Sequence, residues 1–497
     1  MGVIENQASK STIYIFLGIT IGLLNTILFP HFLPAEKKGI LDSITSASYI
    51  LSSIFTIGLP LVTLRHFPKF RSLSKNNYGF LGFSISLTII GALAGLVFLK
   101  FIFNEKVSEE YQTIFYFSLL FFAFLFRLIF SNLDSLIRMN YNTVLGVVSS
   151  NIILKIISLI SVSLFAFSFI EFNTLLMIFV FGLCSPGIIS LFYLIFSSSF
   201  GINIFDFFKR VNSLKLKSDL FKTSIYGFFG SIGGVMVLEI DRIMLLDMMG
   251  FKELGIYTTA ALFGVVVNVP SRSLRGISAT VISESWKNND LNNIKNIYKK
   301  ATLNLQIFSG FIFVSILICA PYLYTFMKPE YSLGVDIIIY IGIAQFIDAL
   351  TSVNTDILMS SVYYKFQTYF VFFMVGIVIS LNLLLIPTYG MTGAAISTMI
   401  AWSSINIIRT LFIWIKFKMQ PFTKHNLKVF ILLFLLYIIA FIIKEQIISF
   451  IPLINLTVMM IFITTIYWLI ILKTKISIDI NNKFLKIITI IKQKLNI

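Results

Sequence analysis

The chain has 497 residues, of which 57% are hydrophobic and only 12% are charged. Because an ordinary soluble domain carries about 25% charged residues, this composition excludes a soluble globular protein. The net charge of +17 could suit nucleic-acid binding, but the basic residues lie between apolar segments along the whole chain, which argues against a nucleic-acid surface.

Apolar segments of about 20 residues, the length needed to cross a hydrocarbon core, predict fourteen membrane spans. They cover residues 11–33, 42–64, 79–99, 112–137, 143–168, 174–198, 223–246, 254–283, 303–326, 334–360, 367–387, 391–415, 429–443 with its flanks, and 449–472. These spans leave no room for a separate extramembrane domain. Cys184 and Cys319 both lie in apolar spans and the three histidines are scattered, so we expect no disulfide, metal site or cofactor.

Lysine and arginine are distributed unevenly between the two sets of alternating loops. Of the 39 basic residues, 26 fall on the side that includes both termini, seven on the other side and six within the spans. The positive-inside rule therefore predicts that both termini are cytoplasmic.

An internal repeat relates the second and eighth spans. Pro60-Leu-Val-Thr-Leu-Arg65 is similar to Pro270-Ser-Arg-Ser-Leu-Arg275, and Lys38-Gly39-Ile40 corresponds to Leu254-Gly255-Ile256. We therefore expect an all-α polytopic membrane protein with two pseudo-symmetric six-helix lobes and two extra C-terminal helices. The expected parts are the N-terminal lobe (1–200), a cytoplasmic linker (201–221), the C-terminal lobe (222–418), helices 13 and 14 (419–472) and a basic cytoplasmic tail (473–497). Pro60 and Pro270 are candidate hinges, or else kink their helices only for packing.

Three spans carry polar stripes at helical spacing. The stripes are Gly264, Asn268, Arg272, Arg275 and Ser278 in the eighth span, Arg127, Ser131, Asp134 and Arg138 in the fourth, and Gln345, Asp348, Ser352 and Asp356 in the tenth. A charge at mid-bilayer costs about 2.5–3.5 kcal/mol, so such residues usually face a cavity. The alternative is that they form internal ion pairs that lock helices together, for example Asp348 with Arg275.

The seventh span contains Glu239, Asp241 and Arg242. Glu239 and Arg242 are spaced i, i+3 and can neutralise each other, whereas Asp241 points to another face and is the better candidate for a titrating carboxylate. The Glu-x-Asp triplet also resembles a motif of polyprenyl-sugar glycosyltransferases, although those enzymes carry it in an extracytoplasmic loop. Lys155, in the fifth span, is either the partner of a carboxylate or a cavity cation.

Six basic residues lie within the spans: Arg127, Lys155, Arg242, Arg272, Arg275 and Arg409. They would cost about 15–20 kcal/mol if all faced lipid, so we expect a water-filled cationic cavity between the lobes. Arginine suits phosphate and diphosphate oxygens, which predicts an anionic substrate. The candidate substrate-binding residues are Arg127, Lys155, Asn268, Arg272 and Arg275, and the candidates for coupling or gating are Asp241, Asp348, Glu239 and Arg242.

Two segments carry a family resemblance. Asp241-Arg-Ile-Met-Leu-Leu with Leu254-Gly-Ile-Tyr-Thr-Thr-Ala260, and Asn382-Leu-Leu-Leu-Ile-Pro-Thr-Tyr-Gly-Met-Thr-Gly-Ala-Ala-Ile396, resemble the polysaccharide-exporter (Wzx-type flippase) branch of the MATE-like superfamily. The resemblance implies a flippase, not an enzyme, that moves undecaprenyl-diphosphate-linked oligosaccharides across the bacterial inner membrane by alternating access, for synthesis of O-antigen, capsule or exopolysaccharide. It implies that Arg127, Lys155, Arg272 and Arg275 line the cationic cavity. We expect a monomer whose partners are its lipid-linked substrate, membrane lipids, a polysaccharide polymerase and a chain-length regulator.

Three other functions are alternatives. A multidrug antiporter of the same superfamily usually has twelve spans and an acidic path, which fits less well. A polysaccharide polymerase or ligase has a large periplasmic loop, whereas the predicted outer loops here have only about 3 to 12 residues. A peptidoglycan-precursor flippase is not excluded by any feature of the sequence.

Overall fold

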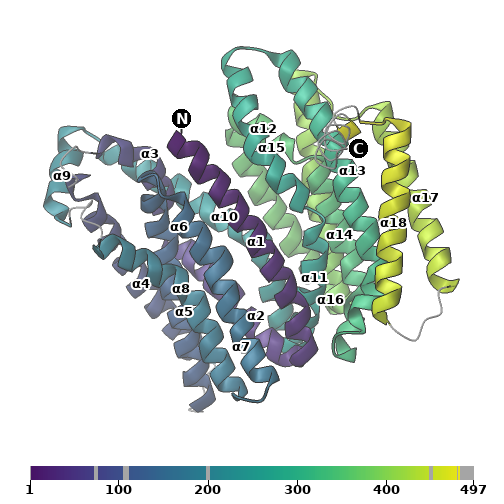
Figure 1. Ribbon diagram of the computed structural model, residues 1–497. Coiled ribbons are helices and arrows are strands. Elements are labelled where there is room, and N and C mark those ends of the chain that lie inside the picture. Colours follow the sequence, from purple (N-terminus) through teal and green to yellow (C-terminus); the bar gives the residue numbers. More distant parts are fainter. Residues whose placement is uncertain are drawn as a thin grey trace, which may run out of the picture. The chain divides into compact units, whose positions relative to one another are not determined.

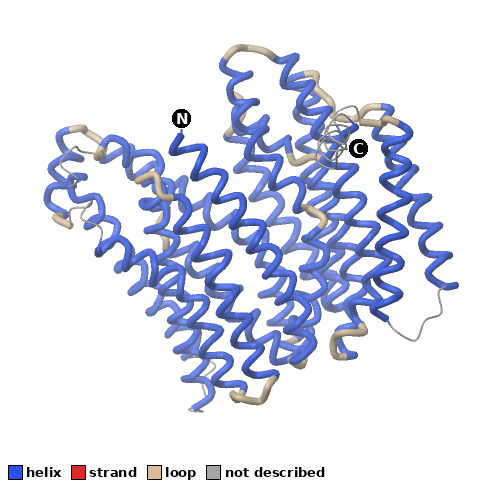
Figure 2. The backbone as a smooth tube through the Cα atoms, in the orientation of Figure 1, coloured by secondary structure: helices blue, strands red, loops and turns tan. Residues whose placement is uncertain are grey.

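The computed structural model describes residues 2–71, 77–104, 111–196, 202–446, 452–477 and 480–481. Nearly all of these residues are helical and none of them forms a strand (Figure 2). Lipid offers the backbone no hydrogen-bond partners, so a chain this apolar satisfies its amides and carbonyls within helices. The predicted all-α class is confirmed.

Ten helices in the described part of the chain are long and apolar enough to cross a membrane. The number rises to eleven if the bent pair Ala35–Phe55 and Leu59–Lys69 counts as one span. The predicted multi-pass architecture is therefore confirmed, while the count of fourteen stays a prediction. The helix over Lys217–Met249 is not among the ten, and it carries the charged residues Glu239, Asp241 and Arg242.

Contacts along the chain define two compact units, residues 1–255 (unit 1) and 256–497 (unit 2). The predicted lobes, with a linker at 201–221, describe an internal duplication, which this division does not test. Unit 1 contains α1 (Gly2–Phe32), α2 (Ala35–Phe55), α3 (Leu59–His66), η1 (Phe67–Lys69), η2 (Asn77–Gly79), α4 (Phe80–Asn104), α5 (Tyr111–Met139), α6 (Thr143–Val148), the π-helical turn η3 (Ser149–Ile153), α7 (Leu154–Ala166), α8 (Phe172–Phe196), α9 (Ile204–Ser213) and α10 (Lys217–Met249) (Figure 1).

The second predicted span is broken between α2 and α3, which bend by 53° at the break. Ile57 and Gly58 have left-handed φ values of 52° and 71°, and Pro60 lies in the first turn of α3. At the break, some backbone carbonyl groups lose the amide partners that a continuous helix would give them. Hydroxyl groups of α10 donate hydrogen bonds to these carbonyl oxygens instead. The Ser224 hydroxyl donates to the carbonyl oxygen of Ile57 (2.5 Å), and that of Ser231 donates to Ser53 (3.0 Å).

Two glycines allow close backbone contact where α2 meets the beginning of α11 (Phe251–Val266). A Cβ on Gly39 would overlap the carbonyl oxygen of Phe251, and a Cβ on Gly255 would overlap that of Ala35. The contacts are reciprocal, since Ala35 and Gly39 precede Phe251 and Gly255 by the same number of residues. Such reciprocity is typical of two copies of a segment related by a twofold axis.

Unit 2 contains the rest of α11, followed by α12 (Val269–Lys287), α13 (Leu291–Tyr324), η4 (Pro329–Gly334), α14 (Val335–Leu350), α15 (Val353–Ser360), α16 (Lys365–Phe417), α17 (Lys424–Gln446) and α18 (Pro452–Thr474). Two of its predicted spans are also broken, at Val267–Asn268 between α11 and α12 and at Thr351–Ser352 between α14 and α15. Pro270 lies in the first turn of α12, as Pro60 does in α3. Within α16, Gly390 has φ 59° and ψ −139° and interrupts the helix between the predicted spans 367–387 and 391–415.

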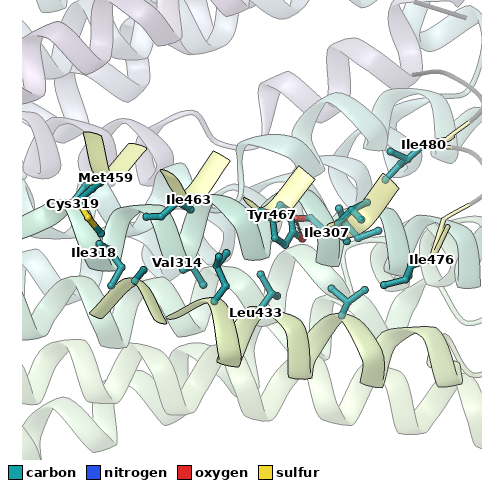
Figure 3. Close-up of a cluster of buried hydrophobic side chains, with 14 residues drawn as sticks. Ile307, Val314, Ile318, Cys319, Leu433, Met459, Ile463, Tyr467, Ile476 and Ile480 are labelled. Carbon is teal, nitrogen blue, oxygen red and sulfur yellow. Dashed lines mark hydrogen bonds between the residues drawn. The ribbon is translucent and has the colours of Figure 1, made fainter. Parts of the chain in front are cut away.

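The two C-terminal helices pack against α13 through an apolar cluster (Figure 3). Ile307, Val314 and Ile318 of α13 contact Leu433 of α17. The α18 side chains in the same cluster are Met459, Ile463, Tyr467 and Ile471, and all of these residues are at most 6% exposed. The phenol of Tyr467 on α18 is fully buried and donates a hydrogen bond to the carbonyl oxygen of Ile307 (2.8 Å). Helices 13 and 14 of the sequence prediction are therefore an integral part of unit 2.

Candidate functional site

A buried polar cluster lies in unit 2 where the break between α11 and α12 meets α14 and α16. Asn268 is the residue before α12, and its side-chain amide donates to Gln345 Oε1 (2.9 Å) and to Asp348 Oδ2 (2.7 Å) on α14. The other oxygen of Asp348 accepts from the Asn406 amide on α16 (3.2 Å). A broken helix places a polar residue at depth without a continuous backbone ladder, and these amides then join three helices through one carboxylate.

Asp348 is only 6% exposed, yet in the described part of the chain it forms no ion pair. The alternative of a direct pair with Arg275 is therefore not what the structure shows. Arg409 of α16 is 5% exposed. Its positive charge is attracted by the carboxylate of Asp348 and repelled by the guanidinium of Arg275. The Nε atoms of Arg275 and Arg409 are buried and have no hydrogen-bond partner among the described residues. The cluster thus holds two guanidinium groups whose hydrogen-bonding capacity is not used up internally.

A second layer of hydrogen bonds continues the cluster along α15. Ser278 of α12 donates to Asp356 Oδ2 (3.2 Å), and Asp356 also interacts electrostatically with Arg275. Asn354 donates to the Thr410 hydroxyl (2.9 Å) on α16 and accepts from the buried phenol of Tyr298. These bonds join α12 to α15, and they join α15 to α13 and α16.

The polar stripe predicted along the eighth span does not lie on one continuous helix. The break at Val267–Asn268 separates Gly264 on α11 from Arg272, Arg275 and Ser278 on α12, with Asn268 at the break itself, so the spacing rule does not carry across it. Asn268 and Ser278 are buried, Arg275 is half-buried and Arg272 is exposed. The structure therefore brings Asn268 and Asp348 into direct contact and leaves Arg272 at the surface of unit 2.

In unit 1 the predicted cations have different environments. The guanidinium of Arg127 on α5 lies 4.0 Å from the centre of the Tyr49 ring of α2, a cation–π contact. Asp134 and Arg138, from the same predicted stripe, form an ion pair of 2.6 Å. Lys155 is the second residue of α7, which follows the π-helical turn η3, and it donates to the carbonyl oxygen of Gly18 on α1 (2.8 Å). Internal pairing therefore explains part of the fourth-span stripe, whereas Arg127 remains half-buried over an aromatic ring.

The charged residues of α10 behave as the spacing predicts. Arg242 pairs with Glu239 at 2.8 Å, one turn away. Asp241 is 5% exposed. Both carboxylates of α10 are therefore buried, and Glu239 is held by Arg242 one turn away.

A cavity of about 510 Å³ lies beside the polar cluster in unit 2. Its walls are mainly apolar side chains of α14, α16 and the segment after α16, among them Ile347, Leu411, Trp414 and Phe422. Asn406 and Thr410 line it and also belong to the cluster. The cluster is thereby connected to an open apolar space at the side of α16.

Sequence reasoning missed the role of α16 in this site. Arg409 was recognised only as a charge within a span, and Asn406 and Thr410 were not singled out. The signal was present, because Asn406, Arg409 and Thr410 are spaced i, i+3 and i+4 and share one face of a helix. Three polar residues on one face of an otherwise apolar span predict an internal contact.

Comparison with known proteins places the fold. No protein-family model matches the sequence, and no curated protein does either. Among solved structures, the lipid II flippase MurJ in an inward closed conformation matches with a TM-score of 0.64 and 16% sequence identity, over 94% of this chain and 99% of that one. An inward-facing multidrug-resistance MATE transporter of the MOP superfamily matches with a TM-score of 0.61 and 10% identity, over 80% of this chain and 94% of that one. A MOP superfamily transporter from Pyrococcus furiosus, described as having a binding pocket of reverse polarity, matches with a TM-score of 0.55 and 10% identity, over 84% and 96% of the two chains.

Helices of this length and composition define a multi-pass α-helical membrane protein. Its fold is the fold of MOP superfamily transporters, shared with MATE proteins and MurJ. At identities of 10–16% the match concerns the fold, and the activity has to be argued from the residues.

Proposed function

We propose that the protein is a flippase that moves an oligosaccharide linked to undecaprenyl diphosphate from the cytoplasmic leaflet to the outer leaflet of a bacterial inner membrane. The observation that carries the proposal is the extent of the match to MurJ. A match over 94% of the chain must include part of the region after residue 418, whereas a match over 80% need not. At least part of the C-terminal region that packs on α13 therefore has a counterpart in MurJ, which supports the proposal.

The basic residues support an anionic head group. Arg275 and Arg409 both have an unused Nε donor, and a diphosphate offers several acceptor oxygens in the planar arrangement that guanidinium groups bind best. Arg272 and Arg275 lie in the first half of α12, directly after a helix break. Broken helices in transporters direct their positive N-terminal ends at anionic groups of the substrate. We assign diphosphate binding to Arg272 and Arg275, with Asn268, Arg127 and Lys155 as further contacts.

Asp348 and Asp241 are the proposed coupling residues, with Glu239 and Arg242 as a gating pair. Asp348 bonds to the α11–α12 break through Asn268 and to α16 through Asn406, so a proton on this carboxylate would weaken both links at once. If both aspartates couple transport to protons, their Asn variants lose the dependence of transport on a pH gradient. Unchanged dependence in both variants would remove this role. Pro60 and Pro270, each in the first turn after a break, are the proposed hinges.

The functional test is the Arg272→Ala variant. We expect it to abolish export of the glycan while the protein remains in the membrane, because an exposed arginine contributes little to folding and its loss removes a diphosphate ligand. Lys287→Ala is the matched control, since it removes one exposed positive charge from the other end of α12. Normal surface polysaccharide in the Arg272 variant would contradict the assignment.

Two related functions are the alternatives. A drug antiporter is suggested by the MATE matches, and a peptidoglycan-precursor flippase is suggested by MurJ itself. Deletion of the gene separates the three. Accumulation of lipid-linked oligosaccharide on the inner leaflet supports the proposal, drug sensitivity alone supports the antiporter, and arrest of wall synthesis supports the precursor flippase.

The topology proposed with this function places both termini in the cytoplasm and the chain in the membrane as a monomer. Its proposed partners are the lipid-linked oligosaccharide, membrane lipids, a polysaccharide polymerase and a chain-length regulator. Reporter fusions after α9 and at the C-terminus test the orientation, because both lie on the side where basic residues are concentrated.

A further inference from the structure

The short helix α9, which links α8 to α10, is amphipathic in an unusual way. At 100° per residue its apolar side chains Ile204, Phe205, Phe207, Phe208 and Val211 cover one broad arc, which also contains the exposed Asn212, and Asp206, Lys209, Arg210 and Ser213 cover the other. One half of the apolar arc faces the protein and the other half does not. Phe207 and Val211 are 1% and 2% exposed, whereas Phe205 and Phe208 are 78% and 49% exposed.

Aromatic packing fixes the buried half of α9 on unit 1. The Phe207 ring stacks on Phe83 of α4 at 4.0 Å between centroids, and on Phe70 at 5.0 Å. The guanidinium of Arg210 lies 4.6 Å from the centre of the Tyr78 ring. These contacts hold two sides of α9 and so fix its rotation about its own axis. They therefore also fix the side on which Phe205 and Phe208 are exposed.

Glycines fix the beginning of α9 as well. The chain just before the helix crosses α4 so closely that a Cβ on Gly79 would overlap the carbonyl oxygen of Asn203, and one on Gly82 would overlap that of Ile202. Gly79 also has φ 67°, which favours glycine. The Asn203 side chain accepts from the Phe205 backbone amide (3.1 Å) and caps the helix. Helix α9 is therefore held against the first turn of α4, beside the end of α3 (Figure 1).

The exposed apolar flank is bordered by positive charge. Residues 202–222 contain five basic residues, Lys209, Arg210, Lys215, Lys217 and Lys222, and two acidic ones, Asp206 and Asp219. All four lysines are exposed. Lys209 is about 40° from Phe205 around the helix, so charge and aromatic ring are neighbours.

We propose that α9 is a membrane-surface helix that binds anionic phospholipid head groups through Lys209, together with Lys215 just after the helix, and inserts Phe205 and Phe208 among the adjoining acyl chains. An interfacial helix has a strongly charged face and an apolar face that penetrates the head-group boundary. Clusters of four to eight basic residues beside a membrane span or on an amphipathic helix are typical of anionic-lipid recognition, and α9, the turn after it and the first turns of α10 together carry five. Helix α9 lies beside the end of α3 and the first turn of α4. It is therefore at the height along the helices where two membrane-spanning elements have their ends.

The position of the helix is tested with a bimane label. Phe208→Cys and Ser213→Cys are made in the full-length chain with Cys184→Ala and Cys319→Ala, and each is reconstituted in phosphatidylcholine vesicles with phosphatidylglycerol. We expect doxyl-labelled lipid to quench the label at position 208, and aqueous iodide to quench the label at position 213 on the polar face. Equal iodide quenching at both positions would overturn the proposal and leave a protein partner as the occupant.

The lipid preference is tested with the label at position 208 and doxyl-labelled phosphatidylglycerol or phosphatidylcholine. One basic residue near the surface changes the association constant for anionic lipid about fivefold, so Lys209→Gln with Lys215→Gln lowers the preference about thirtyfold. Lys287→Gln with Lys295→Gln is the matched control, with the same change of charge away from α9. An unchanged preference in the α9 variant, or an equal loss in the control, would refute specific binding at this helix. Neither result bears on the flippase assignment, which the export assay tests separately.

Discussion

Asp348→Asn is the substitution whose outcome the structure constrains most closely. The variant keeps the size of the side chain but removes the charge that faces Arg409 and disturbs the bonds from Asn268 and Asn406. Interhelical hydrogen bonds in membranes are worth about 0.6 kcal/mol on average, so the two bonds account for about 1 kcal/mol. Asp348 and Arg409 attract each other without forming an ion pair, so this attraction is worth less than about 4 kcal/mol, the value for unit charges about 4 Å apart at an effective dielectric constant of about 20. We therefore expect a total loss of about 1–4 kcal/mol in the free energy of unfolding.

The two contributions are separated by a double-mutant cycle with Arg409→Met. If the uncompensated guanidinium is the larger part, Asp348→Asn costs only about 1 kcal/mol when Arg409 is already methionine, because only the hydrogen bonds are then lost. Unfolding of the purified protein in detergent, followed by circular dichroism, measures all four variants. Asp336→Asn, an exposed carboxylate on the same helix, is the control and should have little effect. Additive costs within about 0.5 kcal/mol would show that Asp348 and Arg409 are not coupled and would refute the electrostatic reasoning.

Two further predictions concern packing. Gly39→Ala forces a methyl group onto the Phe251 carbonyl and should destabilise the protein by about 1–3 kcal/mol, which is measured as a lower unfolding temperature. The control is Gly230→Ala, which adds its Cβ in open space and should leave the unfolding temperature unchanged. An equal effect of both would contradict the close contact. Cys184 and Cys319 are 4% and 3% exposed, so the folded protein should resist maleimide in detergent and react only after denaturation; rapid labelling of the native protein would show that these helices pack differently.

The sequence predicted the broken helices better than it predicted what they surround. Pro60 and Pro270 at repeated positions indicated interruptions, and both prolines lie in the first turn after a break. The interruption within α16 lies at Gly390, between the predicted spans 367–387 and 391–415. A proline or a glycine acts on its own backbone, so its effect can be predicted locally.

The partners of Asp348 could not be predicted in the same way. A helical stripe names the residues that share a face, but the rule holds only along an unbroken helix, and the break at Val267–Asn268 separates Gly264 from Arg272. Nor does spacing say which distant helix lies opposite. Asn268 and Asn406 belong to helices far apart in the chain, and only the packing of unit 2 brings both to one carboxylate. Helix α9 shows the same limit, since its amphipathic pattern does not reveal which half of the apolar arc is buried.

The central claim is tested most directly by transport with purified components. The protein is reconstituted in vesicles that contain a fluorescent oligosaccharide linked to undecaprenyl diphosphate, and the fraction of lipid accessible from the opposite leaflet is followed with a membrane-impermeant reductant. The account predicts translocation that requires the protein and is lost in Arg272→Ala but retained in Lys287→Ala. Translocation no faster than in protein-free vesicles, or at the same rate in both variants, would contradict it.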